Sequence, residues 1–384
     1  MSTLFTGTHT ELKQVVKKVY KVKKPLFVHG TFGIGKTVSI GEVAEEIAKD
    51  LGLEFSKNPA DKNNKKKFCF IPIILHHYDA GEMKGIPFPN AERTHTVYLP
   101  VGLLPEEGQG ILFFDEMNLA LPMMQNNAYQ LIEERRLGDY VVPEGYICIG
   151  AGNLTDDRGN TYDMPMPLNN RFLHFQLNPP TVEDWTNNYA LRKGLDQRII
   201  NYLHYEHGRL YAFKPDANAE QIAVATPRMW EKVSDMIKDI PNANEEELAM
   251  YLSLGVGTAT GNDMVAWLKL SQKYDIASIY RGEAFDMPKP GDVGMMFSLI
   301  SAIVSFYTEK LNVLKDKTVE AKGAADVNKM ATELLKIAVK FKKEYTVLMM
   351  TQAKIGDPLL HPRIQAVDKG LYSKFSKDIF AFLI

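Results

Sequence analysis

The sequence predicts an α/β protein in which a parallel sheet lies between helices and is followed by an all-helical part. Two observations indicate this class. In the first half of the chain, short apolar runs alternate with segments of helical spacing, which is typical of β-α-β units. After Pro179-Pro180 the patterns are helical and strand candidates almost disappear. The 384 residues are enough for two or more domains.

Five strands are expected in the sheet. They are Leu26–Gly30, Phe68–Leu75, Ile111–Phe114, Tyr146–Ala151 and Phe172–Leu177. The second is nearly all apolar, as expected for a parallel strand that is covered on both faces. Helical patterns alternate with these strands, and they include Glu11–Lys24, Val38–Leu51 and Pro122–Arg136.

Pro179-Pro180 marks the expected domain boundary. We expect an α/β core over residues 1–179, a helical domain over 180–310 and a helical C-terminal extension over 311–384. Apolar residues from Val327 to Leu348 recur at steps of three and four, which predicts one long amphipathic helix. Its apolar stripe either packs on the preceding helices or docks a partner helix.

Composition and charge exclude several classes of protein. Hydrophobic residues make up 45% of the chain, which excludes a disordered protein. The formal net charge is -2, so the overall charge does not indicate a protein that attracts nucleic acid. Cys69 and Cys148 stand in apolar runs and are expected to be buried in a reduced compartment. The first ten residues show no secretory signal, and the apolar stretch Met295–Tyr307 is too short for a membrane span. A cytoplasmic protein is expected.

The strongest motif follows the first expected strand. Residues 30–37 read Gly-Thr-Phe-Gly-Ile-Gly-Lys-Thr and fit the pattern G-x-x-x-x-G-K-[ST]. Glycines let backbone N–H groups turn toward phosphate oxygens, and the helix that follows adds its positive N-terminal end. Lys36 is expected to reach the β- and γ-phosphates of ATP, and the Thr37 hydroxyl is expected to hold Mg²⁺. The residues predicted to bind nucleotide here are Gly30, Gly33, Ile34, Gly35, Lys36, Thr37 and Val38. The alternative is a glycine-rich surface turn.

Two further strand ends carry polar groups that nucleotide hydrolysis needs. Asp115 and Glu116 follow an apolar strand, so Asp115 is expected to hold Mg²⁺ and Glu116 to activate the attacking water. Asn153 follows the next strand and is expected to position the same water. Taken singly, exposed acids after a strand and an asparagine in a turn are both common.

These elements occur in an order that resembles the AAA+ ATPases, and within them the MoxR-like branch. Gly30–Thr37 is similar to Walker A, Ile111–Glu116 to Walker B, and Asn153 falls at the place of sensor 1. The segment Leu168–Phe172 resembles the one that carries the arginine finger, here Arg171. Ala225–Trp230 resembles the start of the sensor 2 helix. Thr226 is a good N-cap residue and Pro227 suits the first helical position. Arg228 then lies in the first turn, near a helix N-terminus, where an arginine is placed to recognise phosphate. The resemblance fades after about Tyr307, and Phe32 departs from the proline often found in the family's loop.

The resemblance implies a P-loop fold with a five-stranded sheet, a helical lid over 180–310 and a homo-oligomeric ring, typically of six subunits. Arg171 would then reach the nucleotide of the neighbouring subunit, whereas a surface or interdomain salt bridge is its plain alternative. For Arg228 the alternative is a solvated arginine. Two insertions, Asp79–Pro105 and Arg136–Pro143, are expected to form hairpins or loops that either contact the molecule being remodelled or are structural decoration.

Other polar groups are candidates for metal binding or for roles near Glu116. His76 and His77 would point to opposite faces of a strand, and no H-E-x-x-H pattern or cysteine cluster is present, so no metal besides nucleotide-bound Mg²⁺ is expected. His76 or Asp79 could lie near Glu116 and modulate it. The lysines at 62, 65, 66 and 67 are expected to be solvated.

The leading hypothesis is therefore an ATP-hydrolysing, chaperone-like remodeller of a partner protein, which the resemblance suggests carries a von Willebrand factor type A domain. Two alternatives stay open. One is a motor ATPase stimulated by nucleic acid, which the balanced charge disfavours. The other is a scaffold that binds ATP with little turnover, which the presence of Glu116 and Arg171 disfavours.

Overall fold

A computed structural model describes residues 4–78, 85–99, 102–154, 162, 164, 166–214, 222–240, 244–317 and 321–379. The chain divides into two compact units, with the change at Pro180/Thr181, and each unit is described by itself. Helix α12 (Val293–Lys317) continues across residue 311, where the C-terminal extension was expected to begin. The division into core, lid and extension stays a prediction. None of the described helices is long and apolar enough to cross a membrane.

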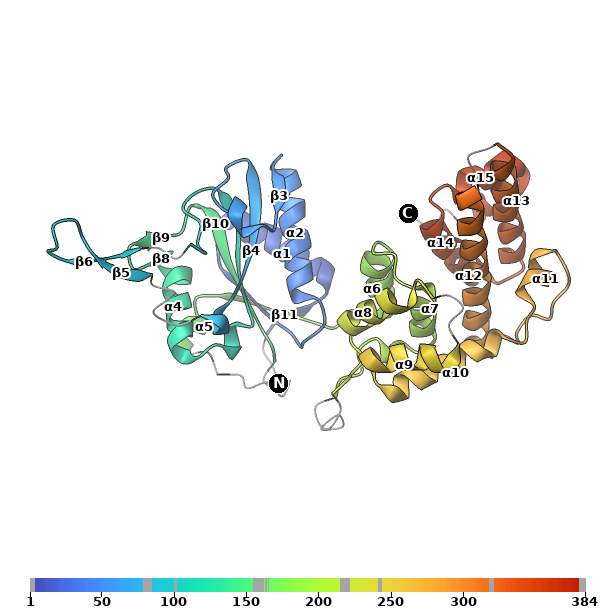
Figure 1. The fold of residues 1–384 in the computed structure, drawn as a ribbon, viewed down its shortest axis with the longest axis horizontal. Coiled ribbons are helices and arrows are strands. Elements are labelled where there is room, and N and C mark those ends of the chain that lie inside the picture. The colour runs from blue at the N-terminus through green and yellow to red at the C-terminus, as the bar shows by residue number, and fades with distance from the viewer. Residues whose placement is uncertain are drawn as a thin grey trace. The chain divides into compact units, whose positions relative to one another are not determined.

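The first unit is built on a parallel sheet of seven strands, which confirms the predicted α/β class (Figure 1). The spatial order is β1-β11-β2-β10-β7-β4-β3. The strands are β1 (Thr6–Gly7), β2 (Leu26–His29), β3 (Glu54–Ser56), β4 (Lys67–Ile74), β7 (Gln109–Asp115), β10 (Gly145–Gly152) and β11 (Leu173–Leu177). All five expected strands are present. The two additional ones, β1 and β3, are short strands at the edges, too short to give a sequence pattern.

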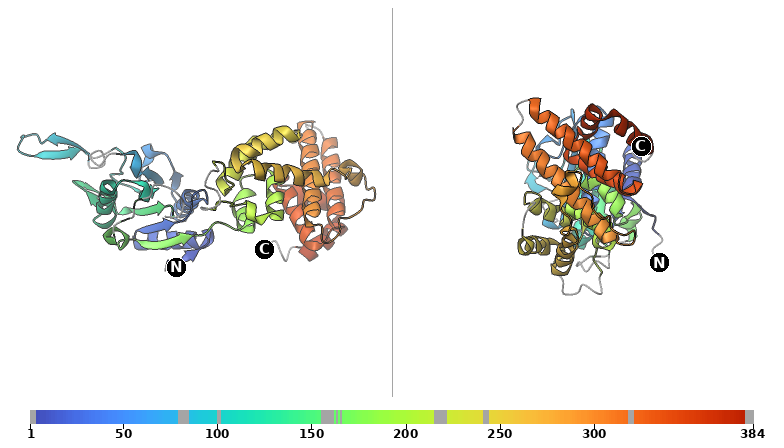
Figure 2. Two further views of the ribbon diagram at one scale, coloured as in Figure 1. Left: turned by 90° about the horizontal axis from the view of Figure 1, so that it is seen from below. Right: turned by 90° about the vertical axis from the view of Figure 1, so that its right-hand side faces the viewer.

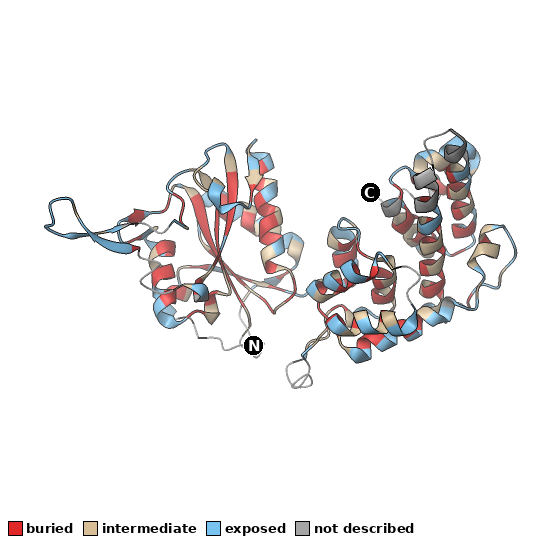
Figure 3. Ribbon diagram, viewed as in Figure 1, coloured by how far each residue is buried: buried red, intermediate tan, exposed pale blue. Residues whose placement is uncertain are grey.

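Helices cover both faces of this sheet. They are α1 (His9–Val22), α2 (Lys36–Asp50), α4 (Pro122–Glu133) and the short α5 (Met166–Asn169). Alternate residues of a strand point to opposite faces, so Phe68 meets Tyr20 of α1, whereas Cys69 packs in the cluster that contains Met124 and Leu131 of α4. Buried residues concentrate in the strands and on the inner helix faces (Figure 3). Both cysteines are buried, as expected.

Two small antiparallel hairpins extend from the first unit, as the sequence predicted for the two insertions. Strands β5 (Ile86–Pro89) and β6 (Thr96–Leu99) form the longer hairpin, which projects away from the sheet (Figures 1 and 2). Strands β8 (Arg136–Leu137) and β9 (Tyr140–Val141) form the shorter one. Ile86, Phe88 and Tyr98 are exposed on the longer hairpin. Asp79, at the start of the first insertion, lies outside the described residues, as does the side chain of His76.

The described residues of the second unit contain helices and no strand. The helices are α6 (Val182–Trp185), α7 (Gln197–Tyr205), α8 (Pro227–Ile237), α9 (Glu245–Val256), α10 (Thr258–Leu268), α11 (Ile276–Tyr280), α12 (Val293–Lys317), α13 (Ala321–Ala338), α14 (Lys343–Gly356), α15 (Leu360–Val367) and α16 (Lys369–Ile379). Two apolar clusters hold them together. One is built from residues between Val182 and Trp267, and the other from residues between Ile279 and Phe375.

The prediction of a single long helix over Val327–Leu348 is wrong. Helix α13 ends at Ala338 and α14 begins at Lys343. The Thr346 hydroxyl donates a 2.7 Å hydrogen bond to the Ala338 carbonyl and so satisfies one of the groups that a helix end leaves unpaired. The apolar spacing continues through the break because both helices, and the buried Phe341 between them, face the same cluster.

Candidate nucleotide-binding site

The loop between β2 and α2 has the backbone that the glycine pattern predicts. Gly33 and Gly35 have φ of 74° and 94°, a region that glycine enters without steric cost. At Gly30 a Cβ would lie 2.9 Å from Ile34 Cδ1 and 3.1 Å from the Leu177 carbonyl oxygen, so any side chain there would require Ile34 and the backbone at Leu177 to shift. Helix α2 begins directly after Gly35, at Lys36, and its N-terminal end therefore adjoins the loop.

Lys36 is held inside this loop. Its side chain is buried, and Nζ donates hydrogen bonds to the carbonyl oxygens of Gly30 at 2.6 Å and Thr31 at 3.0 Å. A third bond, of 2.9 Å, goes to Oδ1 of Asn153. The structure thus brings together the lysine of the loop and the asparagine at the end of β10, two residues that the sequence predicted for one site.

Thr37 and Asp115 also meet. The Thr37 hydroxyl donates a 2.6 Å hydrogen bond to Oδ2 of Asp115, at the end of β7. A hydroxyl and a carboxylate are the hard oxygen donors that Mg²⁺ prefers, and two such donors leave room for phosphate oxygens and water. The residues present therefore fit the predicted metal.

Glu116 adopts the left-handed backbone conformation, with φ 51° and ψ 37°. A residue with a side chain pays about 1–3 kcal/mol for such a conformation, and such residues are enriched at functional sites. The strand ends at Asp115, and this turn redirects the chain into the short helix Met117–Leu119. Glu116 is partly buried, next to Asp115.

The order of the sheet explains why these side chains converge. Strand β10 lies between β2 and β7 in a parallel sheet, so the loop that follows β2 and carries Lys36 adjoins the strand ends at Asn153 and Asp115. Asn118 completes the arrangement. Its amide donates to the Asn153 carbonyl at 2.8 Å, and its Oδ1 accepts from the Asn153 N–H at 3.1 Å. Asn118 thereby fixes the backbone of Asn153.

Three histidines that the sequence analysis did not single out lie at the base of this site. His9, the first residue of α1, donates from Nε2 to the Ile34 carbonyl at 2.8 Å. His29, which precedes Gly30, lies with Nε2 2.9 Å from His174 Nδ1, and His174 Nε2 lies 2.7 Å from the Asn169 carbonyl. Burial, with smaller contributions from His174 and Lys36, lowers the pKa of His29 to about 4.

The hydrogen bonds of this pair fix its tautomers. A carbonyl only accepts, so His174 carries its hydrogen on Nε2 and, when neutral, accepts at Nδ1. His29 must then donate from Nε2. The neutral pair therefore links the strand that precedes the loop to the turn at Asn169, two residues before Arg171.

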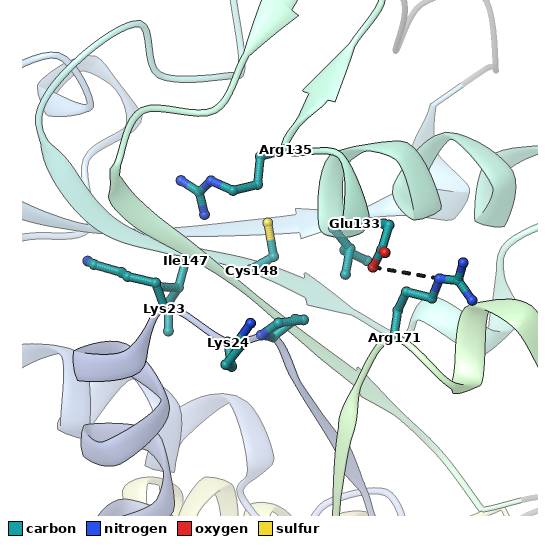
Figure 4. Close-up of a pocket in the computed structure, with 9 residues that line it drawn as sticks. Lys23, Lys24, Glu133, Arg135, Ile147, Cys148 and Arg171 are labelled. Carbon is teal, nitrogen blue, oxygen red and sulfur yellow. Dashed lines mark ion pairs between the residues drawn. The ribbon is translucent and has the colours of Figure 1, made fainter.

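Arg171 lies beside α4. Its contacts are with residues other than Lys36, Thr37, Asp115 and Asn153. Its Nη1 donates to the Pro167 carbonyl at 3.1 Å, and its guanidinium lies 5.2 Å from the centre of the Tyr129 ring. Its Nε is 3.6 Å from Oε2 of Glu133, an ion pair that is too long for a hydrogen bond and leaves the buried Nε–H without an acceptor (Figure 4). The residue lines a pocket of about 260 Å³ together with Lys23, Lys24 and Arg135.

Arg228 belongs to the second unit. The Thr226 hydroxyl accepts from the Met229 N–H at 3.3 Å and Pro227 occupies the first turn, so the predicted start of this helix is confirmed. Arg228 is exposed in that turn. Its role toward nucleotide stays a prediction, and so does the trans role of Arg171.

No protein-family model matches the chain, and no curated protein matches it. Among solved structures, a mutant of RuvB from Thermotoga maritima is 14% identical, with 71% of this chain and 73% of that one covered and a TM-score of 0.32. NtrX from Brucella abortus in complex with ATP is 11% identical, covering 94% and 69%, with a TM-score of 0.32. AMPPCP-bound DnaA from Aquifex aeolicus is 12% identical, covering 98% and 96%, with a TM-score of 0.31. At these values the similarities do not establish a family or a function for this chain.

Proposed function

We propose that this chain is an ATP-hydrolysing protein of the AAA+ class. One observation carries the proposal. Lys36 of the glycine-rich loop bonds Asn153 at 2.9 Å and Thr37 bonds Asp115 at 2.6 Å, so three motifs that are far apart in sequence form one site. Each residue type suits the chemistry of phosphoryl transfer, which depends mainly on positioning and on neutralising charge.

The proposed roles follow from where each group lies. The loop backbone from Gly30 to Val38 cradles the phosphates, and Lys36 exchanges its carbonyl partners for phosphate oxygens. Thr37 and Asp115 would hold Mg²⁺, which when bound neutralises phosphate charge. Glu116 accepts a proton from the attacking water, and Asn153 orients that water.

We further propose a MoxR-like ring in which each ATP site is completed by a neighbouring subunit, because the contacts of Arg171 are to Pro167, Glu133 and Tyr129 and not to the nucleotide site of its own subunit. A trans arginine is worth about 10³–10⁵ in rate in related phosphoryl transfer. The buried Nε of Arg171 supports this role, because that N–H has no hydrogen-bond acceptor among the described residues of its own subunit. Arg228 would read the γ-phosphate from the lid.

We propose that the partner remodelled by such a ring is a protein. The resemblance to the MoxR-like branch suggests that this partner carries a von Willebrand factor type A domain. The exposed Ile86, Phe88 and Tyr98 of the β5–β6 hairpin suit contact with an unfolded or apolar segment. Stimulation by nucleic acid and a nucleotide-gated scaffold remain the competing functions. A cytoplasmic location is proposed with the ATPase role.

The test is ATP turnover per subunit as a function of protein concentration. We expect specific activity to rise with concentration and reach a plateau, because each site needs a neighbour. Glu116→Gln and Arg171→Ala should be nearly inactive, whereas Arg192→Ala, a change at an exposed arginine of the second unit, should behave as wild type.

The outcomes separate the competing functions. Specific activity that does not vary with concentration, together with an active Arg171→Ala variant, would refute the trans arginine. Stimulation by DNA or RNA that falls steeply as salt rises would favour the motor. Tight ATP binding without turnover at any concentration would favour the scaffold.

A further inference from the structure

Three metal-ligating side chains meet in the second unit, none of which belongs to the proposed nucleotide site. They are Glu183 on α6, His204 on α7 and His207 in the turn that follows α7. One ligand atom of each lies within 4.8 Å of the other two, and Nε2 of His207 is 3.0 Å from Oε1 of Glu183.

The fold sets this geometry before any ion arrives. Helices α6 and α7 share one apolar cluster, in which Val182 and Trp185 pack with Ile199 and Leu203. Helix α7 ends at Tyr205, and the turn that follows at Glu206 leaves the ring centres of His204 and His207 6.3 Å apart.

His204 is the best-fixed of the three groups. Its Nε2 is 3.2 Å from the Thr186 hydroxyl, and its ring stacks on Phe297 with an interplanar angle of 11°. A hydrogen bond of this kind is what orients a ligating histidine in metal sites. Burial lowers the pKa of His204, which favours the neutral imidazole that binds metal.

The donor set selects a class of metal. Two imidazoles and one carboxylate are ligands for Zn²⁺ and for similar divalent transition metals, whereas Mg²⁺ and Ca²⁺ prefer oxygen alone. Metal–ligand distances of about 2.0–2.2 Å place tetrahedral ligands about 3.4 Å apart, so small side-chain rotations would complete the geometry. Three protein ligands leave a fourth position for water or another ligand.

We propose that Glu183, His204 and His207 bind one divalent transition-metal ion of the zinc class. No metal besides Mg²⁺ was expected from the sequence, because the chain has no H-E-x-x-H pattern and no cysteine cluster. The His-x-x-His spacing at 204 and 207 was the available signal.

The test uses the full chain, treated with a chelator and kept without nucleotide so that the loop site does not contribute. Zn²⁺ is titrated by calorimetry, and Co²⁺ by the visible absorption bands of its four-coordinate complexes. We expect one ion per chain. His207→Ala and Glu183→Gln change exposed side chains and should weaken binding by about 100-fold or more, beyond the 10–100-fold typical of outer-shell partners. His95→Ala, at an exposed histidine of the β5–β6 hairpin, is the matched control and should bind as wild type.

Unchanged circular dichroism of the variants shows that a loss of binding comes from the lost ligand and not from misfolding. The proposal is wrong if the wild type takes up neither ion, or if His207→Ala, Glu183→Gln and the wild type bind Co²⁺ equally. A saturable uptake that disappears equally in His95→Ala would also overturn it.

Discussion

Replacing His29 by glutamine should make the first unit less sensitive to acid. The buried His29 has a pKa of about 4, against 6.5 for an unperturbed histidine, so between these values the unfolded chain takes up a proton that the folded chain refuses. The free energy of unfolding therefore falls as pH decreases from 6.5 to 4. At 1.36 kcal/mol per pH unit, the loss attributable to His29 is about 3 kcal/mol at pH 4.

Glutamine removes the titrating group and keeps the hydrogen bond. Its amide N–H can donate to Nδ1 of His174 as His29 Nε2 does, so the variant should match the wild type near neutral pH. Near pH 4 the variant should have lost about 3 kcal/mol less stability than the wild type, because it lacks this protonation.

The assay must read the first unit alone. All three tryptophans, Trp185, Trp230 and Trp267, belong to the second unit, so fluorescence in urea provides the internal control. Hydrogen exchange of peptides that cover β2 and β11 reports the first unit. The reasoning is refuted if the wild type and the His29→Gln variant lose the same hydrogen-exchange protection in β2 between pH 6.5 and 4, while their urea transitions measured by fluorescence are identical. Burial of neutral His29 would then not cause the acid sensitivity.

Three other changes test separate contacts. Asn118→Ala removes both hydrogen bonds to the Asn153 backbone and should lower the free energy of unfolding by about 1–3 kcal/mol, measured in urea, and slow single-turnover hydrolysis. Lys36→Met removes the buried ammonium and should weaken binding of a fluorescent ATP analogue by at least about 10-fold; equal affinity would contradict the proposed site. Asp357→Ala removes the buried carboxylate that pairs with the Arg363 guanidinium and should lower the free energy of unfolding by about 3–5 kcal/mol, measured by tryptophan fluorescence in urea. Asp326→Ala, at an exposed aspartate, is the control and should leave that free energy unchanged.

The parts of the fold that the sequence predicted are those in which local pattern and tertiary role coincide. Four of the five central strands, β2, β4, β7 and β10, are mostly buried on both faces, so their apolar runs are long enough to recognise. The loop was recognisable because its glycines serve backbone conformations that few other residues adopt, as Gly33 and Gly35 show.

The remaining features depend on contacts between distant segments. Nothing near Asn118 indicates that its amide will face Asn153, and nothing near His29 indicates a bond to His174, 145 residues later. The break between α13 and α14 was missed for a related reason. Apolar periodicity records which side faces the core, and it does not change when the chain turns but keeps facing the same cluster.

The pairing of β2 also determines how much of the chain must be synthesised before this unit can fold. Leu26 pairs with Ile149 on one side and with Leu173 on the other, and Thr6 pairs with Gln176. Such distant pairings make folding slow, and none of them can form before the later strand has left the ribosome. A nascent chain that stops before Leu173 leaves an edge of the loop-bearing strand β2 open to other chains. Premature termination anywhere before that point would therefore yield an aggregation-prone product rather than a smaller working unit.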